Sequence, residues 1–128
     1  MDKKYRILVV DDDPDFVKAT TIVLESKGYE VLTAVDGIEG LTAAKKEKPD
    51  LILLDVIMPA RDGFTAAEKL KEDPSLSKIP VVMLTSFSAA RAGTAIAANR
   101  GMNLDAEDYL EKPVSPKDLL ACVGQFLK

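Results

Sequence analysis

Short apolar runs alternate along this chain with segments in which apolar residues recur every three or four positions. A continuous apolar run is typical of a strand buried on both faces, and helical segments between such runs favour βαβ units around a parallel sheet. The expected fold class is therefore α/β, and 47% of apolar residues in a chain of 128 supplies a core on both faces of a sheet. Strands are predicted near residues 5–10, 30–34, 51–54, 81–84 and 108–111.

Helix ends are predicted by capping residues and by proline and glycine. Asp13 is a good N-cap in front of Pro14, and Lys27-Gly28 ends this first helix. The other three helices are expected to begin at the capping-box pattern Asp36–Glu39 and end before Pro49, to end at Asp73-Pro74, and to begin at Ser115-Pro116. The predicted buried faces are Phe16, Thr20, Val23 and Leu24 in the first helix, Ile38, Leu41 and Ala44 in the second, and Phe64, Ala67 and Leu70 in the third.

Residues 88–106 fit this alternation least well. The segment is rich in alanine, contains Gly93 and Gly101, and is longer than one helix and a short loop require. A short helix and an ordinary surface loop are both compatible with this composition.

Charge and composition exclude several functions. The net charge of −4 and a pI near 4.9 argue against a nucleic-acid-binding surface. The chain has no histidine, so it cannot form a Ser-His-Asp triad or a zincin site, and any histidine chemistry must come from a partner. The single Cys122 is expected to be a small core or helix-face residue. No apolar run approaches the roughly 20 residues of a membrane span, and we expect a cytoplasmic protein.

Residues suited to phosphate or magnesium chemistry follow four of the predicted strands. Because the carboxyl ends of parallel strands share one edge of a sheet, these residues should converge there. Taken singly, an acidic residue usually caps a helix, a threonine ends a strand and a lysine is solvated. Three adjacent carboxylates, however, repel one another unless a cation lies among them or protons bind. The combination predicts a metal and phosphoryl-transfer site made of Asp11, Asp12, Asp55, Thr85 and Lys112, whereas Asp13 is expected only to cap.

The stretches of sequence around these site residues resemble the receiver domain of bacterial two-component response regulators, and the resemblance covers essentially the whole chain. The resemblance implies a flavodoxin-like, doubly wound sheet of five parallel strands in the order 2-1-3-4-5, with helices on both faces. It also implies that residues 1–128 form a single receiver domain without an output domain, either alone or as part of a longer regulator. The matching stretches are residues 7–14, 53–59 with 62–63, 82–86 and 108–113.

The resemblance also implies a role for each site residue. Asp55 would accept a phosphoryl group from a phosphohistidine on a sensor histidine kinase or phosphotransfer protein. Asp12, Asp55 and the backbone carbonyl of Ile57 would bind Mg²⁺ directly, and Asp11 would bind it through water.

Three further roles concern the phosphorylated state. Lys112 and the hydroxyl of Thr85 would contact phosphoryl oxygens, and Tyr109 would move inward as Thr85 is drawn to the phosphate. The output would be a changed affinity for a downstream protein at the face made by a fourth helix within residues 88–106, the strand at 108–111 and the last helix. The chain would catalyse only its own phosphorylation and dephosphorylation, with no direct contact to nucleic acid and no membrane insertion.

Two alternatives to this function are open. One is a phosphorylation-independent binding module on the same fold, which would be expected to lose one or more of Asp12, Asp55, Thr85 and Lys112. The other is a metal-dependent phosphatase, whose Asp-x-Asp pattern would require an acid at Ile57.

Overall fold

The structure, a computed structural model, describes residues 4–55, 63–86, 108–112 and 114–127; for residues 63–67, 85–86, 108–109 and 111 it describes the backbone alone. Five strands form one parallel sheet in the order β2-β1-β3-β4-β5, which confirms the predicted order. The strands are β1 (Arg6–Val10), β2 (Glu30–Ala34), β3 (Leu51–Asp55), β4 (Val81–Ser86) and β5 (Asp108–Lys112).

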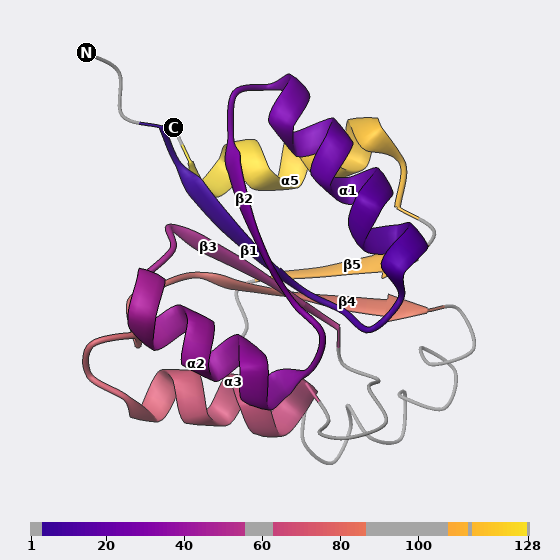
Figure 1. Cartoon of the computed structure of the whole chain (residues 1–128). Helices are drawn as coiled ribbons and strands as arrows, with labels where there is room; N and C mark the ends of the chain where they lie inside the picture. Colours follow the sequence, from indigo (N-terminus) through magenta and orange to yellow (C-terminus); the bar gives the residue numbers. More distant parts are fainter. Residues whose placement is uncertain (1–3, 56–62, 87–107, 113, 128) are drawn as a thin grey trace.

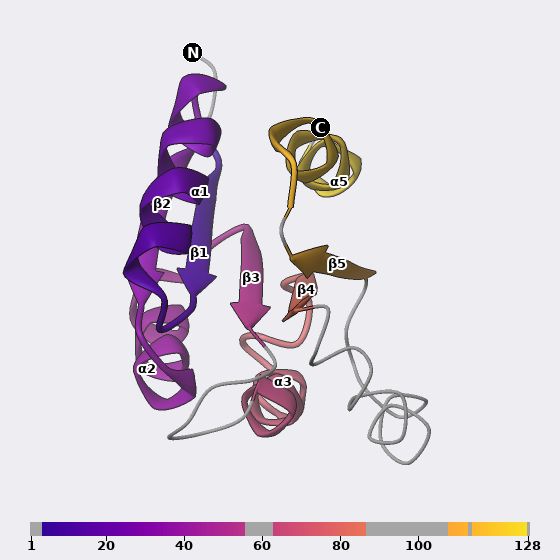
Figure 2. The ribbon, with the colours of Figure 1, turned by 90° about the vertical axis from the view of Figure 1, so that its right-hand side faces the viewer.

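Helices cover both faces of this sheet, as the sequence predicts. Figure 1 shows α1 (Pro14–Ser26) and α5 (Pro116–Phe126) on one side and α2 (Gly37–Glu47) and α3 (Gly63–Glu72) on the other. The rotated view in Figure 2 separates the same two layers. The elements therefore form three layers, with the sheet in the middle. Among the described residues, no helix is both long and apolar enough to cross a membrane.

The continuous apolar runs of the strands are explained by two cores, one on each face. In β1, Leu8 and Val10 belong to the core that also contains Ala44 of α2, whereas Ile7 and Val9 belong to the core that contains Leu24 of α1. Because successive strand residues point to opposite faces, both sets must be apolar. Cys122 is buried in the second core, as predicted.

The predicted helix caps are confirmed by hydrogen bonds. Asp13 Oδ1 accepts from the backbone N–H of Asp15 at 3.0 Å, and Ser115 Oγ accepts from the N–H of Asp118 at 3.1 Å. Asp36 Oδ1 accepts from the N–H of Glu39 at 2.8 Å. Such caps can be predicted from sequence because both partners lie within one turn.

The predicted buried face of α2 is wrong at one position. Ile38 is 53% exposed, whereas Gly37, Gly40 and Ala44 are buried. A side chain on Gly40 would meet Val10: its Cβ would lie 2.9 Å from Val10 Cγ2. The helix therefore turns its small residues toward β1 and its isoleucine toward solvent.

The other predicted faces are confirmed where they are described. Thr20 and Leu24 are buried in α1, with Phe16 and Val23 partly buried, and Leu70 is buried in α3. The predicted face of α3 also includes the side chains of Phe64 and Ala67, which lie outside the described part, as does the segment 88–106.

Candidate functional site

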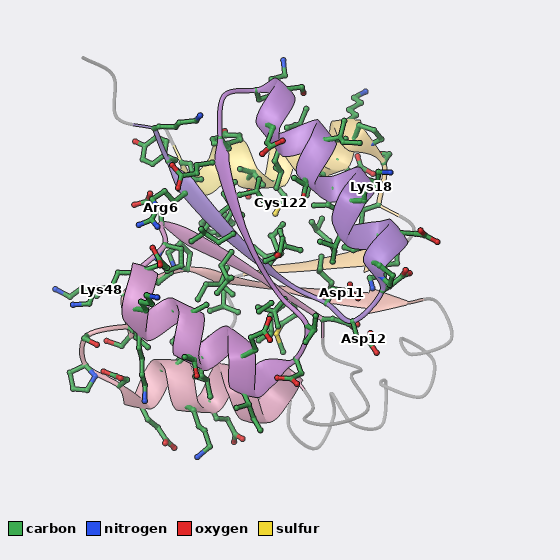
Figure 3. All side chains as sticks on the ribbon, viewed as in Figure 1. Arg6, Asp11, Asp12, Lys18, Lys48 and Cys122 are labelled. Atoms are coloured by element: carbon green, nitrogen blue, oxygen red, sulfur yellow. The ribbon has the colours of Figure 1, made fainter. Side chains whose placement is uncertain are left out.

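The carboxyl edge of the sheet brings together acidic residues from two neighbouring strands. β3 ends on Asp55, and β1 is followed directly by Asp11 and Asp12. The N–H of Asp11 donates to the carbonyl of Ala34 at 3.0 Å, which extends the pairing with β2 by one residue and fixes the chain at this point. Figure 3 shows Asp11 and Asp12 at the end of β1, beside the start of α1.

These three carboxylates form a compact cluster, as predicted. One carboxylate oxygen from each of Asp11, Asp12 and Asp55 lies within 4.8 Å of the others. Asp11 is 1% exposed and Asp55 is 5% exposed, whereas Asp12 faces solvent. Two of the carboxylates are thus removed from water while the third keeps the cluster accessible.

Lys112 supplies a positive charge to this cluster. Its Nζ lies 2.5 Å from Asp11 Oδ2 and 3.6 Å from Asp55 Oδ2, and its side chain is 18% exposed. Lys112 is the last residue of β5, which is separated from β3 by β4. The lysine stem therefore spans the end of β4 to reach the carboxylate at the end of β3 and that of Asp11, which directly follows β1.

Asp11 is held through both of its carboxylate oxygens. Oδ1 accepts from the N–H of Asp13 at 2.9 Å, and Oδ2 accepts from Lys112. Asp13 in turn caps α1, as predicted. The buried carboxylate therefore joins the loop before α1 to the end of β5, and Asp12 is left as the exposed member of the pair.

A groove of about 390 Å³ opens beside the acidic cluster, between α1 and the end of β2. Asp11 and Asp12 line one end of it. The remaining lining residues are Pro14, Val17, Lys18, Thr33, Ala34 and Val35. This groove gives water access to the cluster from the α1 side.

The residues present fit a hard divalent cation. Mg²⁺ prefers oxygen ligands and usually keeps several waters, which matches three carboxylates of which one is exposed. Three carboxylates so close together are costly without added positive charge, and one ammonium group offsets only one of them. The charge balance therefore favours a cation at this edge.

Three predicted site groups are described in part or not at all. Thr85 lies in β4 opposite Glu111, and Tyr109 lies in β5 opposite Met83, so their backbones are placed but their side chains lie outside the described part. Ile57, with its carbonyl, also lies outside it.

Sequence reasoning missed one neighbour of the site. The ring centroid of Phe16 lies 4.3 Å from Lys112 Nζ. The spacing of apolar residues places Phe16 only on the buried face of the first helix. A signal was present, because side chains in the first turn of a helix lean toward its N-terminus, where Asp11 and Asp12 lie.

The sequence-family model described as the response regulator receiver domain matches residues 7–124 of this chain. The chain belongs to this family. As a receiver domain, it belongs to two-component signalling, and its relatives give no support to a phosphorylation-independent module.

Two curated relatives illustrate the range of proteins that contain such a receiver. The chain is 42% identical to the DNA-binding dual master transcriptional regulator RpaA of Synechocystis over 96% of its length, and 38% identical to protein PilH of Pseudomonas aeruginosa over 95%. It spans 49% of RpaA but 97% of PilH. Several other curated relatives are matched over about half of their length or less.

One similar solved structure contains a magnesium ion. The receiver domain of the sensor histidine kinase PA1611 of Pseudomonas aeruginosa is 25% identical, with a TM-score of 0.84 over 97% of this chain and 98% of that one. That structure is described as having a magnesium ion coordinated in its active site cleft.

Proposed function

We propose that Asp55 is the phosphoacceptor of this receiver domain and that a protein-bound phosphohistidine is its donor. The observation that carries this proposal is the cluster in which carboxylate oxygens of Asp11, Asp12 and Asp55 lie within 4.8 Å of one another. The ammonium group of Lys112 lies beside two of these carboxylates, those of Asp11 and Asp55. Asp55 is a buried carboxylate and the last residue of the central strand β3, where it pairs with Leu84 of β4. Since these 128 residues contain no histidine, the phosphohistidine must lie outside them, on a sensor histidine kinase or a phosphotransfer protein.

The reaction is a transfer between two nucleophiles. A carboxylate oxygen of Asp55 attacks the phosphorus atom, the P–N bond to the donor histidine breaks, and its electron pair returns to the imidazole ring. The product is an acyl phosphate on Asp55. Lys112, 3.6 Å from Asp55, is placed to offset the charge of the transferred group.

Asp12, Asp55 and the backbone carbonyl of Ile57 would hold Mg²⁺ directly, with Asp11 acting through water. Both oxygens of Asp11 already accept hydrogen bonds, which supports the indirect role for this residue. The magnesium site described for the receiver of PA1611 supports the same choice of metal. When bound, Mg²⁺ supplies positive charge that offsets charge on the transferring phosphoryl group.

The response is proposed to be a shift between two conformations. The hydroxyl of Thr85 would bond to the phosphoryl group, and Tyr109 would follow it inward. The face formed by residues 88–106, β5 and α5 would then bind a downstream protein. On this proposal the chain is a cytoplasmic signalling domain that catalyses only its own phosphorylation and dephosphorylation and acts through protein partners.

The proposal is tested with a small acyl phosphate donor, with and without Mg²⁺, by intact-mass measurement. The wild type should gain one phosphoryl group in Mg²⁺ and none when the metal is chelated, and Asp55→Asn should gain none in either condition. Asp13→Asn is the matched control, because asparagine caps a helix as well as aspartate and Asp13 only caps α1. Equal labelling of Asp55→Asn and the wild type would refute the proposal.

A further inference from the structure

Within the described part of the chain, Lys112 also lies against a group that is not a carboxylate. Its Nζ lies 4.3 Å from the ring centroid of Phe16, within the range in which an ammonium group is attracted to an aromatic face. The two residues are far apart in sequence and come from different layers, Phe16 from the first turn of α1 and Lys112 from the end of β5. The lysine side chain is mostly buried, at 18% exposed, which strengthens such an interaction.

Phe16 is held both at its backbone and at its side chain. The N–H of Phe16 lies 3.4 Å from Asp13 Oδ1 in the cap of α1, which fixes the backbone beside the acidic loop. The side chain is partly buried and lines an apolar groove of about 260 Å³ between α1 and α5, together with Val23, Val114 and Leu119. Val114 follows Lys112 by two residues, so the ring lines a groove that also contains the segment carrying the lysine.

The ring matters because the other partners of Lys112 have a second task. Asp11 and Asp55, which face the ammonium group at 2.5 and 3.6 Å, are also two of the three residues that would serve a metal ion. A lysine on a flexible four-carbon stem loses its position when its anionic partners are drawn elsewhere. The ring of Phe16 has no such competing task.

We propose that Phe16 is a positioning residue for Lys112: its ring keeps the ammonium group at the carboxyl edge of β3 while Asp11 and Asp55 serve the metal and the phosphoryl group. The inference rests on the proposed role of Asp55 and deepens it by adding a residue that acts through Lys112. A purely apolar role for Phe16 predicts that leucine is an adequate replacement. A role in holding the cation requires an aromatic ring.

The kinetic test compares Phe16→Leu, Phe16→Tyr and the wild type during phosphorylation by a small acyl phosphate in saturating Mg²⁺. Phe16→Leu should be slower by about three- to tenfold, the range expected for one lost cation–π contact. Phe16→Tyr should recover to within about twofold of the wild type. Val23→Ala is the matched control, because Val23 lines the same groove. A leucine variant as fast as the wild type, or a tyrosine variant as slow as leucine, would overturn the proposal.

A second readout does not depend on phosphorylation. The chain contains no tryptophan, so Phe16→Trp introduces a single indole reporter at the ring position. Its emission should differ from that of Phe16→Trp combined with Lys112→Met, and the difference should persist when Mg²⁺ is added. Identical spectra would mean that the ring does not hold the ammonium group. Failure of wild-type phosphorylation together with distinct spectra would instead refute the role of Asp55 and leave the contact between Phe16 and Lys112 established.

Discussion

At the residue scale, Lys112 sets the charge balance of the acidic cluster. Its ammonium group lies close to two buried carboxylates, Asp11 and Asp55, and is mostly shielded from solvent. Such a pair attracts more strongly than the same pair in water, because the effective dielectric constant is lower. Lys112 therefore stabilises the metal-free cluster and at the same time competes with any cation that binds there.

Lys112→Met removes this charge and keeps a stem of similar length. We expect Mg²⁺ to bind more tightly by about three- to tenfold, since the competing cation is gone, and phosphorylation to be slower by about tenfold or more. Calorimetric titration with Mg²⁺ and intact-mass kinetics measure the two effects. Lys117→Met, which removes an exposed lysine from α5, should change neither. Weaker Mg²⁺ binding in Lys112→Met would show that the lysine assists the metal instead of competing with it.

At the element scale, the distance between α2 and β1 is set by a glycine. Gly40 is buried and faces Val10, the residue that precedes Asp11. A methyl group at position 40 would lie 2.9 Å from one methyl group of Val10 and 3.1 Å from the other, so something must shift. The close approach of α2 to β1 therefore depends on the absence of a side chain there.

Gly40→Ala should destabilise the fold by about 1–3 kcal/mol, because overpacking outweighs the gain in helix propensity of about 1 kcal/mol. Gly124→Ala in α5 is the matched control: apart from its own helix backbone, its Cβ would meet no heavy atom of the described residues within 4 Å. That variant should be more stable by about 0.5–1 kcal/mol. Urea unfolding of the two variants measures the contrast. If alanine stabilised both positions, the contact between Gly40 and Val10 would not limit the approach of the helix.

At the element scale, the helix caps could be predicted from the sequence, whereas the rotation of α2 and the exact strand ends could not. The caps of α1, α2 and α5 were predictable because donor and acceptor lie within one turn. The burial of Ile38 was predicted wrongly, because the rotation of α2 is decided by Val10 in another element. Two strands also extend one residue beyond their predicted ends. β3 includes Asp55 and β5 includes Lys112, because each of these residues still pairs with a residue of the neighbouring strand β4.

The site itself could be predicted in part. The convergence of Asp11, Asp12 and Asp55 follows from the shared edge of a parallel sheet. The choice of Asp11 as the closest partner of Lys112, and the position of Phe16 beneath the ammonium group, depend on side-chain packing between distant elements. No local pattern encodes those contacts.

At the scale of the whole molecule, the acidic cluster links metal binding to folding. The three carboxylates meet only when β1 and β3 are paired, so a cation that needs all of them binds the folded chain alone. At ten times its dissociation constant, Mg²⁺ should then raise the free energy of unfolding by about 1.4 kcal/mol. Thermal melts over a Mg²⁺ series measure this gain.

Two variants make that prediction specific. Asp12→Ala should abolish the stabilisation by Mg²⁺, whereas Asp13→Asn should preserve it, because Asp13 caps α1 and does not belong to the cluster. A melting temperature that is indifferent to Mg²⁺ in the wild type would count against a metal site at this edge.

The central claim is that Asp55 alone carries the phosphoryl group. The most direct measurement is to phosphorylate the wild type in Mg²⁺, reduce the acyl phosphate with borohydride, which converts a phosphorylated aspartate to homoserine, and sequence the peptides by mass spectrometry. We predict homoserine at position 55, with Asp11, Asp12 and Asp13 unchanged. Homoserine at one of those three positions, or a phosphoryl group retained on a hydroxyl side chain, would contradict the account.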